Sequence, residues 1–301
     1  MPNADQRAML GRRALLAAVL TGSVAGLAGC GIRMEGDAPH IPGIQKQGPP
    51  PDQATLRVLV TSIDTAISAA GHSAWETTLA GVHRAQRTRL LAVMATQGMT
   101  PAATTAQPTG PAVDPGAMFR FEQAGARAIG SLMTLSARNL PMAAAIAVTQ
   151  NAGAALLGHR VAVNGGVVPK PAVVQAILPS LRAAIYAFEV IIAKTPLKAR
   201  KRAEATLTGL HAVRATWEAS LGKDLPTSPD GFTLPVQPTT NARRQQLAQL
   251  VLTDLVDACA GQVTATRSDR GGFIGLTTLW ADSTAQLWQW GAKPTPFPGL
   301  Q

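Results

Sequence analysis

Two pairs of acidic residue and histidine, with identical spacing, are the residues of this sequence best suited to chemistry. Glu76 stands seven residues before His83, and Glu204 stands seven residues before His211. On a helix this spacing puts both side chains of a pair on one face, two turns apart, so that a group from a neighbouring helix could lie within reach of both. Carboxylate and imidazole groups are ligands for iron and other divalent metals. The pairs therefore indicate either a metal site or a buried polar network.

Two further carboxylates could complete such a site in the second half of the chain. Glu189 and Asp254 both stand among apolar residues of expected helices, so their side chains are predicted to be buried. A buried carboxylate needs a charged or hydrogen-bonding partner. An arginine or His211 would serve as a purely structural partner. If a metal binds instead, the predicted ligands of a mononuclear site are Glu189, Glu204, His211 and Asp254.

The elements that would position these residues are helices. Hydrophobic residues make up 46% of the 301 residues and charged residues only 15%, which excludes an intrinsically disordered chain. Apolar residues recur at helical spacing in eight stretches, and no alternation of apolar and polar residues indicates a strand. The predicted helices cover residues 54–70, 73–97, 116–138, 141–158, 172–195, 197–222, 241–266 and 271–290.

An internal repeat divides these helices into two groups of four. Residues 76–83 (ETTLAGVH) align with residues 204–211 (EATLTGLH) at an offset of 128. In each half a Pro-rich stretch without a helical pattern follows the second helix, at residues 98–115 and 222–238. A crossover of this length can run along a whole helix, as it does in ferritin-like bundles. The sequence thus predicts an all-α protein of two tandem ferritin-like four-helix bundles, at residues 54–163 and 172–291, with a Pro-rich tail at 292–301.

The N-terminal residues 1–29 have the features of an export signal. A basic start that includes Arg12 and Arg13 precedes an uncharged apolar stretch, and Leu27-Ala28-Gly29-Cys30 matches a lipobox. We therefore expect cleavage after residue 29 and attachment of a lipid to Cys30. The apolar stretch is shorter than the roughly 20 residues that a membrane-spanning helix needs. The two arginines favour the twin-arginine route, with the general secretion route as the alternative.

The mature protein is expected at the outer face of the cytoplasmic membrane. Residues 30–53 form a tether rich in Gly and Pro between the lipidated Cys30 and the first helix. The net charge of +10 on the whole chain would draw a tethered protein toward an anionic membrane surface, but we interpret the charge first as that of a solvated protein surface. Nucleic acid is not an expected partner outside the cytoplasm. The predicted partners are the membrane, reached through the lipid on Cys30, and an envelope protein of unknown identity.

Several of these features together resemble one protein family. The features are the twin-arginine lipoprotein signal, Cys30-Gly31-Ile32-Arg33 before an acidic Pro-rich tether, the Leu-x-Gly-x-His helix, the Pro-rich crossover and the closing Pro296-Phe297-Pro298-Gly299-Leu300. This combination is similar to the actinobacterial ferritin-like proteins of unknown function, best over residues 172–301 and as a diverged copy over 54–160. The resemblance implies a ferritin-like fold in the cell envelope, and it carries no established activity.

A standard di-iron site is not expected in either bundle. Di-iron enzymes of this fold use four carboxylates and two histidines, with a Glu-x-x-His on each of two helices. This chain has six Glu residues in all and no Glu-x-x-His, because Ala80 stands three residues before His83 and Thr208 three before His211. We therefore predict no cofactor, with iron or another divalent metal as the alternative.

The leading functional interpretation is a non-catalytic interaction or structural module of the cell envelope. The first alternative is a metal-binding protein, either an iron store or an oxidase with a non-standard site. The second alternative is binding of a lipid or another apolar ligand between helices, which the very apolar helix stripes permit. The chain has neither a Gly-rich phosphate-binding loop nor a Gly-x-Ser-x-Gly sequence, so nothing specific indicates nucleotide binding or nucleophilic hydrolysis.

Overall fold

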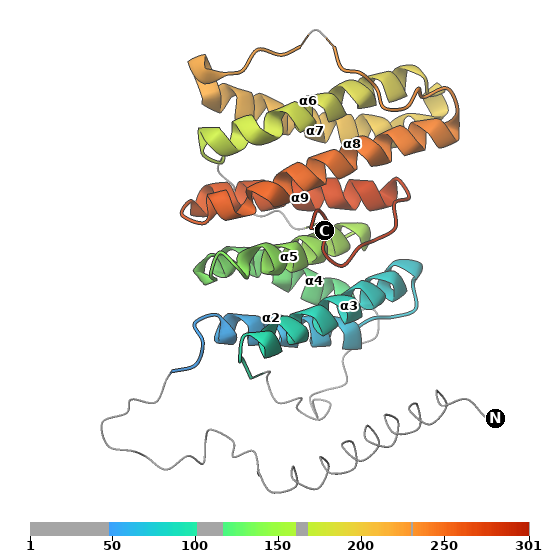
Figure 1. Ribbon diagram of the computed structural model, residues 1–301. Helices are drawn as coiled ribbons and strands as arrows, with labels where there is room; N and C mark the ends of the chain where they lie inside the picture. Colours follow the sequence, from blue (N-terminus) through green and yellow to red (C-terminus); the bar gives the residue numbers. More distant parts are fainter. Residues whose placement is uncertain (1–47, 101–116, 161–167, 230, 301) are drawn as a thin grey trace, which may run out of the picture. The chain divides into compact units, whose positions relative to one another are not determined.

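The computed structural model describes residues 48–100, 117–160, 168–229 and 231–300 (Figure 1). The predicted export signal with Arg12, Arg13 and Cys30 lies outside these ranges, and so does most of the first predicted crossover. All regular structure in the described ranges is helical, without a strand, which confirms the all-α prediction. The α-helices are α2 (Gln53–Ser68), α3 (Ala74–Thr96), α4 (Met118–Arg127), α5 (Leu140–Leu156), α6 (Pro171–Ala193), α7 (Lys201–Leu221), α8 (Asn241–Gln262) and α9 (Arg270–Gln289).

Local sequence signals fix where several of these helices begin. The Ser73 hydroxyl accepts a hydrogen bond from the backbone N–H of Glu76, and the Glu76 carboxylate accepts one from the backbone N–H of Ser73. This capping box satisfies two of the backbone donors that every helix start leaves free. The side chains of Thr240 and Asp269 cap the N-terminal ends of α8 and α9. Pro171 is the first residue of α6, a position that needs no backbone donor.

One predicted helix is divided in the structure. Residues 116–138 were expected as a single helix, but α4 ends at Arg127 and continues as the 3-10 helix η2 (Ala128–Thr134). The backbone carbonyl of Gly130 accepts a hydrogen bond from the Arg270 guanidinium of α9 at 3.0 Å. A tertiary partner for this carbonyl, together with the low helix propensity of glycine, favours the tighter turn over a continued α-helix.

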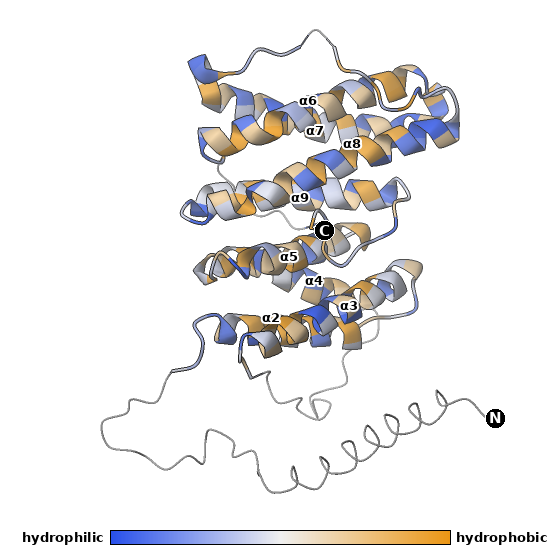
Figure 2. Cartoon of the chain, in the orientation of Figure 1, coloured by the Kyte–Doolittle hydropathy of each residue, from blue (hydrophilic) through white to orange (hydrophobic). Residues whose placement is uncertain are grey.

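The helices pack in order along the chain and share one core. α2 packs on α3, and α4 packs on α5; α6 packs on α7 and on α8, and α8 packs on α9. α5 and α9 also pack against each other (Figure 1), so one continuous cluster of buried apolar side chains extends from α2 to α9. α5 is apolar over most of its surface and nearly all of it is buried (Figure 2). A helix that is apolar all round must be covered on every side, as α5 is by α4, η2 and α9.

The segment between α7 and α8 runs alongside the helices instead of turning sharply (Figure 1). It is held on α6 by two hydrogen bonds: the Gln175 side chain donates to the backbone carbonyl of Asp224, and the Arg182 guanidinium donates to that of Pro226, both at 3.0 Å. Arg182 is nearly buried and also donates to the Glu218 carboxylate of α7 at 2.7 Å. The extended segment therefore has specific anchoring contacts with α6.

α6 is the one helix in the described ranges that is long and apolar enough to cross a membrane by length and composition alone. Half of its most apolar stretch is buried inside the protein. The buried side chains, among them Ile177, Leu181, Ile185 and Phe188, pack on α7 and α8. These contacts are those of a core helix.

Candidate functional site

The four predicted ligands in the second half do not form one buried site. His211 Nε2 lies 3.5 Å from Glu189 Oε1, with 36% of the histidine side chain and 49% of the glutamate side chain exposed. Glu204 and Asp254 are also exposed. Within the described residues, no three His, Cys, Asp or Glu side chains lie close enough together to hold a metal ion.

The prediction that Glu189 and Asp254 are buried is wrong. In α6 the buried stripe passes through Ile185, Phe188 and Ile191, and Glu189 lies beside it. In α8 the inward positions lie on both sides of Asp254, which turns outward with Asp257. A carboxylate can therefore stand among apolar residues in the sequence and still point outward, because each helical residue is rotated by about 100° from the last.

Glu76 and His83 of the first half also have separate roles. The Glu76 carboxylate accepts hydrogen bonds from the backbone N–H and the hydroxyl of Ser73, and so it is committed to the start of α3. His83 lies two turns further on, with no exposed surface. The repeated pair is therefore a helix cap followed by a buried histidine in the first half, and two partly or fully exposed side chains in the second.

His83 is the centre of a buried hydrogen-bond chain. Its Nδ1 lies 2.7 Å from Gln86 Oε1, and its Nε2 lies 2.7 Å from Glu122 Oε1 of α4. Gln86 and Glu122 are also fully buried. The Gln86 Nε2 donates in turn to the backbone carbonyl of Pro296, at 2.5 Å. The chain of bonds thus runs from α4 through α3 to the C-terminal tail, which we define as residues 292–300.

The bonding pattern fixes how protons are arranged in this chain. Because Gln86 Nε2 donates to Pro296, the opposite end of its amide accepts, and His83 Nδ1 must carry a proton. Burial by itself lowers the pKa of His83. The charge of Glu122 and the hydrogen bonds that His83 donates to Glu122 and Gln86 outweigh burial and raise that pKa above its ordinary 6.5. His83 therefore favours the imidazolium form, which donates to the Glu122 carboxylate and leaves the buried pair neutral overall.

The raised pKa of His83 predicts how stability changes with pH. A group whose pKa is higher in the folded state contributes stability fully below its unfolded pKa, and this contribution is lost as pH rises through the folded value. We expect the free energy of unfolding of the wild type to exceed that of His83→Gln by the largest amount below the unfolded-state pKa of 6.5, and by progressively less as the pH rises above that value. Urea unfolding of both proteins at pH values on both sides of this pKa measures the difference. A difference that stays constant or grows with pH would contradict the assignment.

Glycines on α4 and α5 make room for the polar side chains of the facing helix. A Cβ atom at Gly153 would lie 3.0 Å from Glu122 Oε1, and a Cβ atom at Gly125 would lie 2.0 Å from Gln150 Oε1. Glu122 and Gly125 are three residues apart on α4, as are Gln150 and Gly153 on α5. The glycine of each helix thus leaves space for the polar side chain of the other helix. Gln150 Nε2 also donates to Ser62 Oγ of α2, at 3.0 Å.

Two buried oxygens in this region have no hydrogen-bond partner among the described residues. They are Glu122 Oε2 and Gln150 Oε1. A buried acceptor without a partner is costly, so a water molecule or a cation would be a favourable partner for either oxygen. Glu122, Gln86 and Gln150 were not predicted from sequence as site residues. The only signal at Glu122 and Gln150 is a glycine three positions later, which does not identify the partner, and Gln86 has no such signal.

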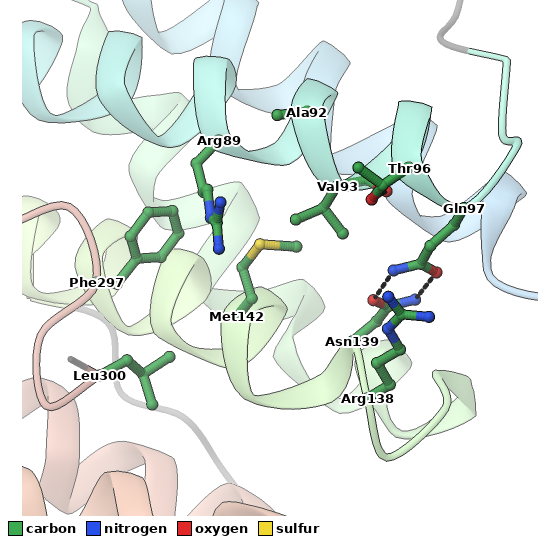
Figure 3. A pocket seen from close by; sticks show the side chains of 10 residues that line it. All are labelled: Arg89, Ala92, Val93, Thr96, Gln97, Arg138, Asn139, Met142, Phe297 and Leu300. Carbon is green, nitrogen blue, oxygen red and sulfur yellow. Dashed lines mark hydrogen bonds between the residues drawn. The ribbon is translucent and has the colours of Figure 1, made fainter.

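A cleft of about 770 Å³ lies between α3, the start of α5 and the C-terminal tail (Figure 3). Its polar side chains are two arginines, Arg89 and Arg138, the amides of Gln97 and Asn139, and the hydroxyl of Thr96, which donates to the backbone carbonyl of Val93. Its apolar side chains come from both helices and from the tail. The full lining is Arg89, Ala92, Val93, Thr96, Gln97, Arg138, Asn139, Met142, Phe297 and Leu300.

Comparison with known proteins identifies only the second half of the chain. Residues 173–301 match a family described as "Domain of unknown function (DUF4439)". The match covers nearly all of α6, then α7 to α9 and the C-terminal tail, and it excludes α2 to α5 with His83 and Glu122. It agrees with the predicted resemblance to a family of unknown function. Searches of curated proteins and of solved structures find no match to this chain.

Proposed function

We propose that this protein is a lipid-anchored module of the cell envelope that acts by binding and not by catalysis. The observation that carries the proposal is the hydrogen-bond chain of His83. In di-iron bundles the inward side chains of all four helices are carboxylates and histidines. Here the buried polar side chains of α2 to α5 include one histidine, His83, and two carboxylates, of which Glu76 caps α3. The others are one hydroxyl and four amides. Both ring nitrogens of His83 are engaged by protein side chains.

The folded part, in this proposal, is two ferritin-like four-helix bundles in tandem, with the boundaries 54–163 and 172–291. The pairing of α2 with α3, α4 with α5, α6 with α7 and α8 with α9 supports this arrangement. The long segment between α7 and α8 supports it as well, because a crossover along the bundle is typical of this topology. A hydrogen bond of 2.8 Å from Thr206 to Gln286 joins α7 to α9 across the second group of helices.

Metal binding is the second candidate function, and the unpaired oxygens of Glu122 and Gln150 favour it. Elemental analysis of the full-length protein, purified from cells supplied with iron, manganese and zinc, separates the two candidates. Less than about a tenth of a metal ion per chain supports the binding module. About one ion per chain that is lost in Glu122→Gln and retained in the exposed control Glu204→Gln would establish a metal site at Glu122 instead.

The proposed anchor depends on one residue. We expect Cys30→Ala to move the protein from the membrane fraction to the soluble fraction, because one substitution removes the thiol that accepts the lipid. Fractionation of cells that produce the wild type and the variant, followed by mass spectrometry of the N-terminal peptide, measures this. Membrane retention at the wild-type level of a variant from which the signal has been cleaved would contradict the lipid anchor while leaving the fold of α2 to α9 unaffected.

A further inference from the structure

We propose that the cleft between α3, α5 and the C-terminal tail binds an amphiphile that combines an anionic head group with a hydrocarbon chain. This inference goes beyond the function proposed above and does not depend on the anchor at Cys30. It rests on three kinds of side chain that line the cleft: self-paired amides, arginines without an ion pair among the described residues, and apolar side chains.

The amide side chains of the cleft already satisfy each other. Gln97 Nε2 donates to Asn139 Oδ1 at 2.8 Å, and Asn139 Nδ2 donates back to Gln97 Oε1 at 2.9 Å (Figure 3). Asn139 Nδ2 also donates to Asp52 Oδ2, at 2.7 Å. Because each of these groups has its partners within the protein, the two amides do not provide the main attraction for a polar ligand.

The polar groups that remain available are two positive charges. Arg89 and Arg138 are exposed, and neither forms an ion pair with any carboxylate in the described part of the chain. In Figure 3 they lie on either side of Met142. The Asp52 carboxylate is buried and is engaged by Ser136 and Asn139. Two free guanidinium groups beside one cleft favour an anionic group, since their fork of donors matches a carboxylate or a phosphate.

The rest of the cleft is apolar and comes from three segments. Val93 of α3, Met142 of α5, and Phe297 and Leu300 of the tail present partly exposed hydrophobic side chains to it. Figure 3 shows Met142 between Val93 and Phe297. A free inorganic anion would leave this apolar surface in water, whereas a hydrocarbon chain would cover it. A volume of about 770 Å³ lies in the range of small-molecule sites.

Binding of oleate tests the proposal directly. The full-length protein with Cys30→Ala is used after delipidation, so that no lipid of its own competes for the cleft. Displacement of a fluorescent fatty acid reports the affinity for three probes: oleate, uncharged oleyl alcohol and inorganic phosphate. We expect oleate to bind at least about tenfold more tightly than either of the others, because only oleate combines charge and chain.

Matched variants locate the binding. Arg89→Gln combined with Arg138→Gln should weaken oleate binding by at least about tenfold. Arg84→Gln combined with Arg127→Gln removes the same charge from exposed arginines outside the cleft and should leave the affinity unchanged. Equal binding of oleate and oleyl alcohol, tight binding of phosphate alone, or full affinity in the Arg89 and Arg138 double variant would each overturn the proposal. Helicity and thermal melting of every variant confirm that it is folded.

The same chemistry could come from a free fatty acid or from a membrane phospholipid. Co-sedimentation with vesicles of phosphatidylglycerol, against vesicles of phosphatidylcholine, distinguishes these sources. If the wild type sediments with phosphatidylglycerol vesicles and the Arg89→Gln, Arg138→Gln variant does not, the head group belongs to an anionic phospholipid. Tight oleate binding without sedimentation assigns it to a free acid. If the protein binds neither oleate nor the vesicles, the cleft proposal is refuted. The result of the Cys30 fractionation test is independent of this outcome.

Discussion

Replacement of His83 by leucine should lower the free energy of unfolding by about 3–5 kcal/mol. The substitution leaves Glu122 with its carboxylate fully buried and without its charged partner. A buried ion loses its hydration on folding, and only the opposite charge and hydrogen bonds of its partner compensate for that loss. Gln86 Oε1 loses its donor in the same step. Equilibrium unfolding in urea measures the change.

Two further variants separate the buried pair from a general effect of losing a histidine. Because His211 and Glu189 lie 3.5 Å apart and are substantially exposed, His211→Leu should cost less than about 1 kcal/mol. The double variant His83→Leu with Glu122→Leu should recover much of the lost stability, since no unpaired charge remains buried. Equal costs for His83→Leu and His211→Leu would show that the His83–Glu122 pair has no special contribution.

Replacement of Gly299 by alanine should detach the C-terminal tail from the helices. Gly299 has φ +75°, and a Cβ atom there would lie 2.6 Å from Ala260 Cβ and 2.9 Å from the backbone oxygen of Val256 in α8. The left-handed conformation and the overlap together should weaken docking of the tail by about 2–4 kcal/mol. We expect carboxypeptidase to remove the last residues of this variant much faster than those of the wild type.

Two glycines provide the controls for this experiment. Gly222→Ala has φ +51° and open space around the new methyl group, so it tests the backbone conformation alone. Gly209→Ala lies inside α7 with open space and should be neutral or slightly stabilising, since alanine favours helix. Neither should affect the tail. If the tail of the Gly299→Ala variant resists digestion as well as the wild-type tail does, this result would contradict the close contact with α8.

The C-terminal tail connects the two features described above. Pro296 accepts the hydrogen bond from Gln86 at the end of the His83 chain, and Phe297 and Leu300 line the cleft. Detachment of the tail should therefore remove part of the cleft as well as one bond of the polar chain. If the cleft binds an anionic amphiphile, Gly299→Ala should weaken that binding although it changes no charge.

The helices of this protein follow from its sequence because the information that specifies them is local. The Ser73 and Glu76 capping box, the proline at the start of α6 and the apolar period of each stretch all act within a few residues. The predicted ends mostly lie within a few residues of the observed ones. The 3-10 helix η2 departs from this pattern, since the partner of its Gly130 carbonyl is Arg270, 140 residues away.

The candidate site shows what the sequence could not determine. Glu76-x6-His83 and Glu204-x6-His211 are the same pattern, yet only His83 is fully buried and ion-paired, because the partner Glu122 comes from another helix 39 residues away. Glu189 and Asp254 stand among apolar residues but lie outside the buried stripes. The order and ends of the helices were thus fixed by local propensity, capping and periodicity. Which histidine is buried, and what lines the cleft, was decided only by how distant helices and the C-terminal tail pack together.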